Sequence, residues 1–405
     1  MKILFLTIAD QIREIETPGI YNDLVRYFRD NGHQMIVMYP TERRNRGRTS
    51  LYTRDGITYL SVRTLNVTKC SILEKGAGQM LIEGQFLRAF RKYLGKEKFD
   101  IILYSTPPIT FTRVIANAKA LNPEAMAYLM LKDIFPQNAL DLGILSHKGF
   151  KGILYNYYRN KEKKLYMISD RIGCMSAANV DYILKNNHFL TPEKVGICPN
   201  SYTPVQREKL SPESIKEIKE KYGLPTDRPL LIYGGNMGVP QGIPFLIGCI
   251  KSMFNTDKCH FVIVGDGTKY KSLELFSQIF CVRTMTLIRS LPKEEFDRLT
   301  EACDVGMIFL DYRFTIPNFP SRMLSYMMAR KPILVVTDPN CDMGSIAQQN
   351  GFGIYSPSNS VTAFNKAVDR ILSSDLQQMG ENGFNYFMNN YTTRHTYNAV
   401  INSKQ

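Results

Sequence analysis

Short apolar runs alternate with amphipathic stretches along the first two hundred residues. Runs typical of buried strands lie at 1–8, 33–39, 56–62, 99–104, 125–131, 171–175 and 195–198. Stretches with helical periodicity lie between them, at 17–31, 72–96, 106–121 and 177–186. Strands that alternate with helices predict a parallel sheet that is covered by helices on both faces.

The same alternation restarts after residue 228. Strand-like runs lie at 229–233, 260–264, 284–288, 304–310, 332–337 and 351–355, with helical stretches at 243–254 and 292–301. The pattern predicts an α/β chain with two doubly wound, Rossmann-like domains, at 1–200 and 229–385. Residues 201–228 are predicted to form a linker with one charged helix, and 386–405 a last helix that packs back on the first domain. Because ligands bind at the carboxyl ends of such strands, two facing domains predict an interdomain cleft.

The composition agrees with two soluble domains. A chain of 405 residues is too long for one ordinary core, and its 44% hydrophobic fraction is ordinary for a globular protein. The sequence has no apolar run of about 18 residues and no cleavage site after its N-terminal apolar run, so we expect neither a transmembrane helix nor a signal peptide. The eight cysteines lack paired metal-ligand spacing, which predicts reduced thiols in a cytoplasmic protein.

A net charge of +14 favours an anionic partner. Residues 41–54 hold five arginines against one glutamate, and residues 147–171 hold seven basic against two acidic residues. In the second stretch the charges interleave with Ile153, Leu154, Tyr157, Tyr158, Leu165 and Tyr166. A basic, aromatic helix predicts docking at an anionic membrane surface; the alternative is a core-packing helix with a solvated basic face. Nucleic acid is not the expected partner, because no binding motif is recognisable.

The stretch 311–330 combines a strand end, an irregular loop and a helix. Pro317 and Pro320 keep regular structure out of the loop. Ser321 is predicted to cap the following helix, with Arg322 in its first turn. A helix N-terminus with an added guanidinium suits an anion, so we predict a phosphate site here. The alternative is a solvated arginine beside a capped helix.

Three glycines within residues 234–238 directly follow a predicted strand. They would allow a phosphate or sugar to approach the backbone closely, although a tight strand-to-helix turn explains them equally well. The segment is neither a Walker loop nor the Gly-x-Gly-x-x-Gly fingerprint, which argues against a dinucleotide dehydrogenase. Residues 265–267 are expected to form a plain turn. Since these strand ends share one sheet edge, the glycine segment and Arg322 are predicted to converge on one pocket.

The first predicted domain offers two further candidates. Asp133 follows the strand at 125–131, where its carboxylate would either orient or activate a hydroxyl or cap a helix. Gly19 would either let a substrate approach the backbone or start the first helix. His33 is expected to be structural. The sequence has no Ser-His-Asp order, no His-Glu-x-x-His motif and no metal-ligand cluster.

Together these motifs resemble a known family. The resemblance is carried by LKDIFP (131–136), CMS (174–176), CPN (198–200), YGGNMG (233–238), IVGDG (263–267), ACDVG (302–306) and PNFPSR (317–322). In order and spacing they are similar to bacterial GT-B glycosyltransferases of the retaining family four, and within it to the WbuB-like subgroup of N-acetyl-L-fucosamine transferases of O-antigen assembly. The resemblance implies a nucleotide-sugar bound by the C-terminal domain and an acceptor on the N-terminal domain.

The resemblance also implies roles for single residues. Gly234, Gly235 and Asn236 would line the diphosphate and sugar, with Arg289, Ser290 and Leu291 near the base. Ser321 and Arg322 would meet the phosphates. Asp133 would face the sugar across the cleft, and Gly19 would lie on the acceptor side. We therefore predict Asp133 and Arg322 as the catalytic pair.

Three positions depart from the family pattern. Two glutamates that are separated by seven intervening residues usually flank the last loop, and here Pro317 and Ser325 stand in their places. Ser325 thus occupies the position that commonly holds the ribose. Gln241 stands where the family has a lysine after the glycine segment. More of the diphosphate charge would then fall on Arg322, with Arg313 or Arg289.

The expected function is a retaining, metal-independent transfer without cofactor. The donor would be a nucleotide-sugar, UDP-linked, carrying an N-acetylated deoxyhexosamine. The acceptor would be a polyprenyl-diphosphate-linked saccharide of capsule or O-antigen synthesis, used at the inner face of the cell membrane. Two alternatives stay open: a UDP-sugar 2-epimerase on the same architecture, and a non-catalytic component of a polysaccharide assembly complex.

Overall fold

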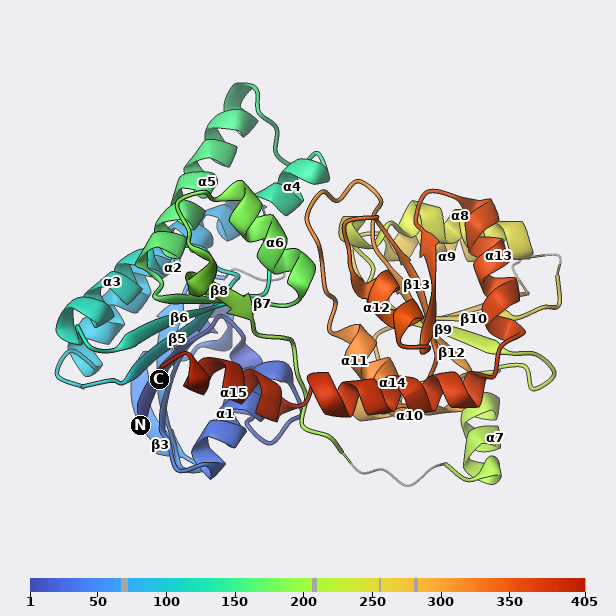
Figure 1. The fold of residues 1–405 in the computed structure, drawn as a ribbon, viewed down its shortest axis with the longest axis horizontal. Coiled ribbons are helices and arrows are strands. Elements are labelled where there is room, and N and C mark those ends of the chain that lie inside the picture. The colour runs from blue at the N-terminus through green and yellow to red at the C-terminus, as the bar shows by residue number, and fades with distance from the viewer. Residues whose placement is uncertain (67–71, 206–209, 255, 280–282, 405) are drawn as a thin grey trace. The chain divides into compact units, whose positions relative to one another are not determined.

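The computed structural model describes residues 1–66, 72–205, 210–254, 256–279 and 283–404. It divides into two compact units. The first unit is Met1–Thr203 with Thr392–Gln405, and the second unit is Pro204–Tyr391. Figure 1 shows the elements of both units in chain order.

The first unit contains a sheet with strand order β3-β4-β2-β1-β5-β6-β7-β8, in which only β3 and β4 pair antiparallel. The strands are β1 (Lys2–Leu6), β2 (Gln34–Glu42), β3 (Ser50–Arg54), β4 (Ile57–Thr64), β5 (Ile101–Ser105), β6 (Met126–Leu131), β7 (Arg171–Cys174) and β8 (Val195–Ile197). The α-helices are α1 (Ile20–Asp30), α2 (Ile72–Tyr93), α3 (Thr112–Leu121), α4 (Gln137–Asp141), α5 (Gly149–Ile168), α6 (Ala177–Asn186) and α15 (Thr393–Asn402).

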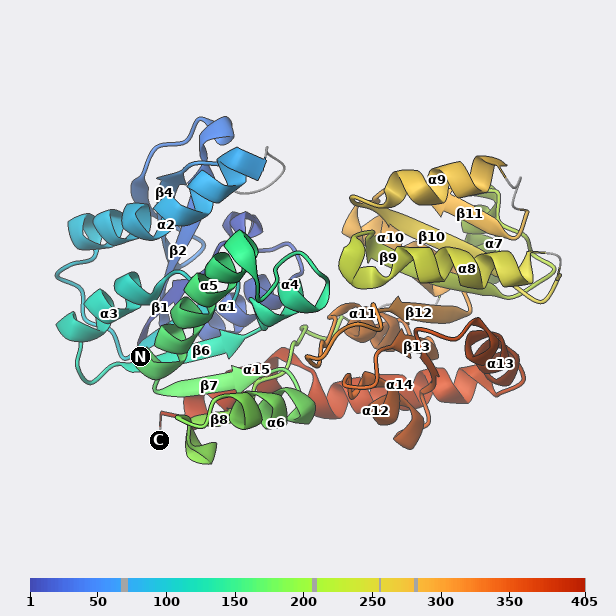
Figure 2. The ribbon, with the colours of Figure 1, turned by 90° about the horizontal axis from the view of Figure 1, so that it is seen from above.

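Side chains of β1 alternate between two apolar layers, as they must when both faces of a sheet are covered. Ile3 and Phe5 pack with Phe28 of α1 and Val400 of α15 in one buried cluster. Leu4 is equally buried on the opposite face. Figure 2 shows α1 and α15 on one side of this sheet and α2 and α3 on the other.

The second unit contains a parallel sheet with strand order β11-β10-β9-β12-β13-β14. The strands are β9 (Leu230–Asn236), β10 (His260–Asp266), β11 (Met285–Ile288), β12 (Val305–Phe309), β13 (Ile333–Thr337) and β14 (Gly353–Pro357). The α-helices are α7 (Pro212–Lys221), α8 (Ile243–Met253), α9 (Tyr270–Ile279), α10 (Lys293–Ala302), α11 (Arg322–Met328), α12 (Met343–Gln349), α13 (Val361–Leu372) and α14 (Leu376–Asn390).

The structure confirms the predicted doubly wound α/β architecture and changes two details. β3 lies in the arginine-rich stretch 41–54, where the sequence pattern predicts no strand, and its mostly exposed side chains explain why no apolar run marks it. The charged helix α7 was assigned to a linker, yet it belongs to the second unit. There the hydroxyl of Tyr222, just after α7, donates a hydrogen bond to Glu295 of α10 at 2.7 Å.

The chain returns to the first unit at its end. Helix α14 closes the second unit, and a β-bridge between Tyr202 and Thr392 begins the return. Helix α15 then packs on α1, where the Tyr397 hydroxyl lies 2.9 Å from Nε2 of His33. His33 therefore has the structural surroundings that were expected of it.

Candidate functional site

Strands β9 and β10 stay paired through the glycine segment, residues 234–238. Gly235 lies opposite Gly265, and Asn236 lies opposite Asp266. Gly265 has a φ of +151°, and a Cβ there would lie 1.8 Å from the Gly235 carbonyl oxygen. The predicted plain turn at 265–267 is therefore corrected: Gly265 and Asp266 end β10, and the close approach of two backbones requires glycine.

Protein atoms fill the space beside the first two glycines of the segment. A Cβ on Gly234 would lie 2.1 Å from the Phe296 ring, and a Cβ on Gly235 would lie 1.8 Å from Nη2 of Arg322. Gly235 also has a φ of +122°. Packing within the protein thus requires both glycines, and the structure brings Arg322 directly against the glycine segment.

Arg322 is half-buried and stacked on an aromatic ring. The carbon centre of its guanidinium lies 4.8 Å from the centroid of the Tyr233 ring. Burial raises the pKa of Tyr233, and the neighbouring guanidinium acts in the opposite direction. Within the described ranges no carboxylate forms an ion pair with Arg322. A cation without a protein counter-ion, held beside a strand end, is suited to an external anion.

The expected cap of α11 is wrong. Ser321 precedes the helix, but its φ of −62° and ψ of −13° are already helical and its side chain makes no capping hydrogen bond. An N-cap side chain needs an extended backbone to reach back to the first turn, so Ser321 cannot serve as one. Ser325 lies half-buried one turn later. The anion-binding capacity of this edge therefore rests on Arg322 and not on a capped helix.

Arg289, Ser290 and Leu291 follow β11 at the same edge of the sheet. The Arg289 guanidinium lies 4.3 Å from the centroid of the Tyr270 ring and 3.9 Å from the Asp266 carboxylate. Ser290 is exposed and Leu291 half-exposed. These residues thus adjoin the end of β10, although the charge of Arg289 is shared with an acidic neighbour.

The other arginine that was expected to share the diphosphate charge is already paired. Arg313 donates from Nε and Nη2 to the two carboxylate oxygens of Asp311, at 2.9 and 2.8 Å. This bidentate contact raises the pKa of Arg313. Because its charge is neutralised within its own loop, Arg322 is the better candidate for the diphosphate.

Gln241 folds back onto the glycine segment. Its Oε1 accepts hydrogen bonds from Nδ2 of Asn236 at 3.2 Å and from the backbone N–H of Gly238 at 3.1 Å. At the position where the resemblance implies a lysine, Gln241 therefore shapes the segment and adds no charge to it.

Sequence reasoning missed Tyr326, whose hydroxyl contacts the backbone of β9 at Ile232 and Gly234. Tyr326 lies among Met323, Leu324 and Met327 on the buried face of α11, so the helical pattern marks it only as a core residue.

In the first unit, Asp133 directly follows β6. Its Oδ1 accepts a hydrogen bond from Nδ2 of Asn138 at 2.7 Å. Burial raises the pKa of Asp133 to about 6, and the Asn138 contact acts in the opposite direction. Pro136 occupies the N-cap position of α4, so the helix-capping alternative for Asp133 does not hold. The structure leaves a desolvated carboxylate near neutral pKa at a strand end, as an acid–base or orienting group requires.

Gly19 is the N-cap residue of α1, with its N–H bonded to Oδ1 of Asp23 at 3.0 Å. Its φ of −178° is extended backbone that any residue adopts. A Cβ there would meet only Asn22, at 3.9 Å. Neither conformation nor packing thus requires glycine at this position, and the predicted acceptor-side role of Gly19 stays a prediction.

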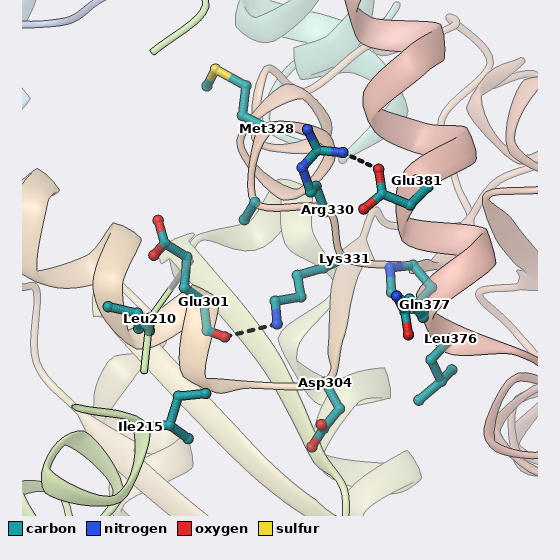
Figure 3. A pocket seen from close by; sticks show the side chains of 12 residues that line it. Leu210, Ile215, Glu301, Asp304, Met328, Arg330, Lys331, Leu376, Gln377 and Glu381 are labelled. Atoms are coloured by element: carbon teal, nitrogen blue, oxygen red, sulfur yellow. Dashed lines mark hydrogen bonds and ion pairs between the residues drawn. The ribbon is translucent and has the colours of Figure 1, made fainter. Parts of the chain in front are cut away.

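A separate pocket lies at the amino ends of β12 and β13, at the opposite edge of the second sheet from the glycine segment. It has a volume of about 320 Å³. Figure 3 shows Arg330 directed toward Glu381 of α14 and Lys331 directed toward Glu301. The Lys331 ammonium donates to the Glu301 carbonyl oxygen at 2.7 Å. Its basic side chains therefore have partners within the protein, and none of the predicted donor residues lines it.

Comparison with known proteins finds a family match in the second unit. Residues 214–386 match the family described as Glycosyl transferases group 1. This match lies within the second unit and covers less than half of the chain. The Pseudomonas aeruginosa protein named Probable glycosyltransferase WbjE is 28% identical to this chain over 256 residues. That match covers 62% of this chain and 61% of the relative's length.

Two solved structures share the fold of this chain. Sucrose-phosphate synthase from Thermosynechococcus elongatus has a TM-score of 0.74 at 12% sequence identity. The alignment covers 99% of this chain and 98% of the synthase chain. Anabaena HepE, solved in complex with UDP, has a TM-score of 0.69 at 13% identity, with 100% and 99% covered. At these identities the likeness shows the fold alone, which is the predicted GT-B fold.

Proposed function

We propose that this chain transfers a sugar from a UDP-linked donor, and that the donor diphosphate binds at Arg322, beside the glycine segment. The observation that carries the proposal is the Arg322 guanidinium, which stands against Gly235 without an acidic partner in the part of the chain that the structure describes. The group 1 family match over this unit and the UDP bound by the structurally similar HepE support it.

The proposed reaction proceeds with retention and without a bound metal or cofactor. The bond between the anomeric carbon and the diphosphate oxygen breaks, and the acceptor hydroxyl forms the new bond on the same face. The hydroxyl proton passes to the departing phosphate oxygen. Arg322 would stabilise the negative charge that develops on the diphosphate, which is the largest electrostatic demand of the step.

Asp133 is proposed to contact the transferred sugar or the acceptor hydroxyl. Its pKa of about 6 keeps it mainly ionised at neutral pH and within reach of protonation below that. An ionised carboxylate orients a hydroxyl by accepting its hydrogen bond. The acceptor is proposed to be a polyprenyl-diphosphate-linked saccharide, and the sugar an N-acetylated deoxyhexosamine. The name of the WbjE relative gives neither, so both rest on the family resemblance.

The exposed side chains of helix α5 support the proposal that the acceptor is used at a membrane. Phe150 is 79% exposed and Ile153 69% exposed, and Tyr157 follows one turn later on the same helix face. Lys148 and Lys151 are exposed beside them. In its last turns the helix buries Leu165 and Tyr166, as the core-packing alternative expects. We propose that the N-terminal half of α5 docks at an anionic membrane surface. No helix in the described ranges combines the length and apolar character needed to cross a membrane.

The loss of both family glutamates, at Pro317 and Ser325, favours a second candidate, a non-catalytic member of a polysaccharide assembly complex.

A thermal-stability measurement with UDP, GDP, dTDP and CMP in the presence of EDTA tests the first proposal. A ligand that binds only the folded state raises the midpoint. We expect a rise with UDP in wild-type protein and none in Arg322→Ala.

A midpoint that no nucleotide raises would contradict the donor site and favour the non-catalytic candidate. With the nucleotide fixed, product analysis separates two enzymes that share this architecture. A transferase leaves the donor sugar unchanged until an acceptor is added, whereas a 2-epimerase converts the donor alone.

A further inference from the structure

Tyr326 joins the helix that carries Arg322 to the strand that carries the glycine segment. It lies on α11 four residues after Arg322, and its side chain is fully buried. Its hydroxyl accepts a hydrogen bond from the Gly234 N–H at 3.2 Å and donates one to the Ile232 carbonyl oxygen at 3.1 Å. One phenol therefore contacts two backbone groups of β9 immediately before Gly235.

The neighbouring strand leaves room for this phenol. A Cβ on Gly306 of β12 would lie 2.4 Å from the Tyr326 ring, so the ring rests on a residue without a side chain. A second tyrosine extends the contact along β9, because the Tyr233 hydroxyl donates to the Asn236 carbonyl oxygen at 2.7 Å. The ring of the same Tyr233 lies under the Arg322 guanidinium.

We propose that Tyr326 is a positioning residue for the donor: it fixes α11 against β9 and thereby holds the Arg322 guanidinium beside Gly235. The inference rests on the proposed donor site. Residues four apart occupy neighbouring turns of one helix face, so a displacement of Tyr326 displaces Arg322 with it. The donors of a guanidinium form a rigid fork, which makes its binding of a diphosphate sensitive to such a displacement.

Tyr326→Phe tests the inference, because it removes the hydroxyl and keeps the ring on Gly306. We expect the affinity for UDP, measured by titration calorimetry, to fall about threefold to tenfold. The same change in an Arg322→Lys background should alter affinity less than about twofold, because a flexible ammonium depends less on exact placement. Tyr104→Phe is the matched control, since it removes a buried hydroxyl that lies 2.6 Å from Oγ of Ser169 in the first unit.

The outcomes separate the inference from the proposed function. An equal loss of UDP affinity in both backgrounds, or an equal loss in Tyr104→Phe, would overturn the positioning role and leave the donor site standing. Wild-type protein that binds no UDP would overturn both. Thermal midpoints of the variants distinguish lost affinity from lost stability. Should Tyr326→Phe not fold, Tyr233→Phe, which loses the hydroxyl contact to Asn236, is expected to show the same dependence on Arg322.

Discussion

Ion pairing with aspartate distinguishes Arg313 and Arg289 from Arg322, and leaves the charge of Arg322 available to a ligand. Arg313 gives its charge to Asp311 and Arg289 shares its charge with Asp266, whereas Arg322 has a ring and a glycine for neighbours. We predict that Arg322→Ala raises the barrier of the chemical step by about 2–4 kcal/mol, as the loss of a strong charge-stabilising donor does. Single-turnover rates with saturating donor would measure it.

The control for this variant is Arg370→Ala, which removes an exposed positive charge from α13 of the same unit. Its rate should stay within about twofold of wild type, because surface charges away from a site contribute little. Equal rates in Arg322→Ala and wild type would show that the diphosphate binds elsewhere.

The raised pKa of Asp133 predicts how the stability of the protein depends on pH. Its folded pKa of about 6 lies above the usual value of 3.8, so the folded state holds the proton more tightly than the unfolded state. Ionisation of this carboxyl therefore lowers the free energy of unfolding, and the loss develops as pH rises from about 4 through 6. Asp133→Asn keeps an acceptor for Asn138 and removes the loss. We expect its thermal midpoint to exceed that of wild type by a few degrees at pH 8 and the gain to shrink at pH 5, while transferase activity falls at both.

Gly19 allows a substitution that should spare the fold. Since a Cβ would meet only Asn22 at 3.9 Å and φ is extended, Gly19→Ala should leave the thermal midpoint unchanged within about one degree. If the acceptor approaches this backbone, the variant should raise the acceptor KM and leave the donor KM unchanged. An unchanged acceptor KM would return Gly19 to a plain helix start.

At the level of elements, most strands and helices follow from the sequence because the apolar runs are long and regularly spaced. β3 does not, since an edge strand with Ser50–Arg54 mostly exposed has no apolar signature. Helix α7 was found but placed in a linker, because its packing on α10 depends on contacts made by Tyr222 and Glu295 far apart in the chain.

The candidate site was only partly predictable, because it too depends on contacts between residues that are far apart in the chain. Glycines after one strand and Arg322 after another are visible in the sequence, and parallel strands end at a common edge. The cap assigned to Ser321 failed because the residue type favours a cap while the backbone there is already helical. Tyr326 could not be found, since the apolar face of a helix does not say which of its residues also bonds a strand.

The close packing of the glycine segment against Arg322 predicts that a substitution at Gly235 affects donor binding. In Gly235→Ala a methyl group would stand 1.8 Å from Nη2 of Arg322, at a φ of +122°. We expect the variant to lose UDP affinity at least about tenfold, since both the backbone and Arg322 must shift. Gly248→Ala on α8 is the control, because its Cβ would lie 3.8 Å from Val361 and alanine favours a helix. Equal UDP binding by both variants would contradict the arrangement.

At the level of the whole molecule, the charge of +14 favours an anionic partner, and helix α5 exposes apolar side chains beside basic ones. Basic residues near a bilayer contribute roughly 1 kcal/mol each with anionic lipids, whereas inserted apolar side chains contribute in any lipid. A surface that uses both should bind anionic vesicles in a salt-dependent way and retain weak binding when the lipid charge is diluted.

The double variant Phe150→Ser, Ile153→Ser tests this surface. We expect its affinity for phosphatidylglycerol-containing vesicles, measured by sedimentation, to fall at least about tenfold, because two exposed apolar side chains no longer insert. Leu275→Ser, Ile279→Ser removes two comparably exposed side chains, 56% and 70%, from α9 and should leave binding unchanged. If both variants bind like wild type, charge alone attracts the protein to the bilayer; if both lose binding equally, the apolar contact is not specific to α5.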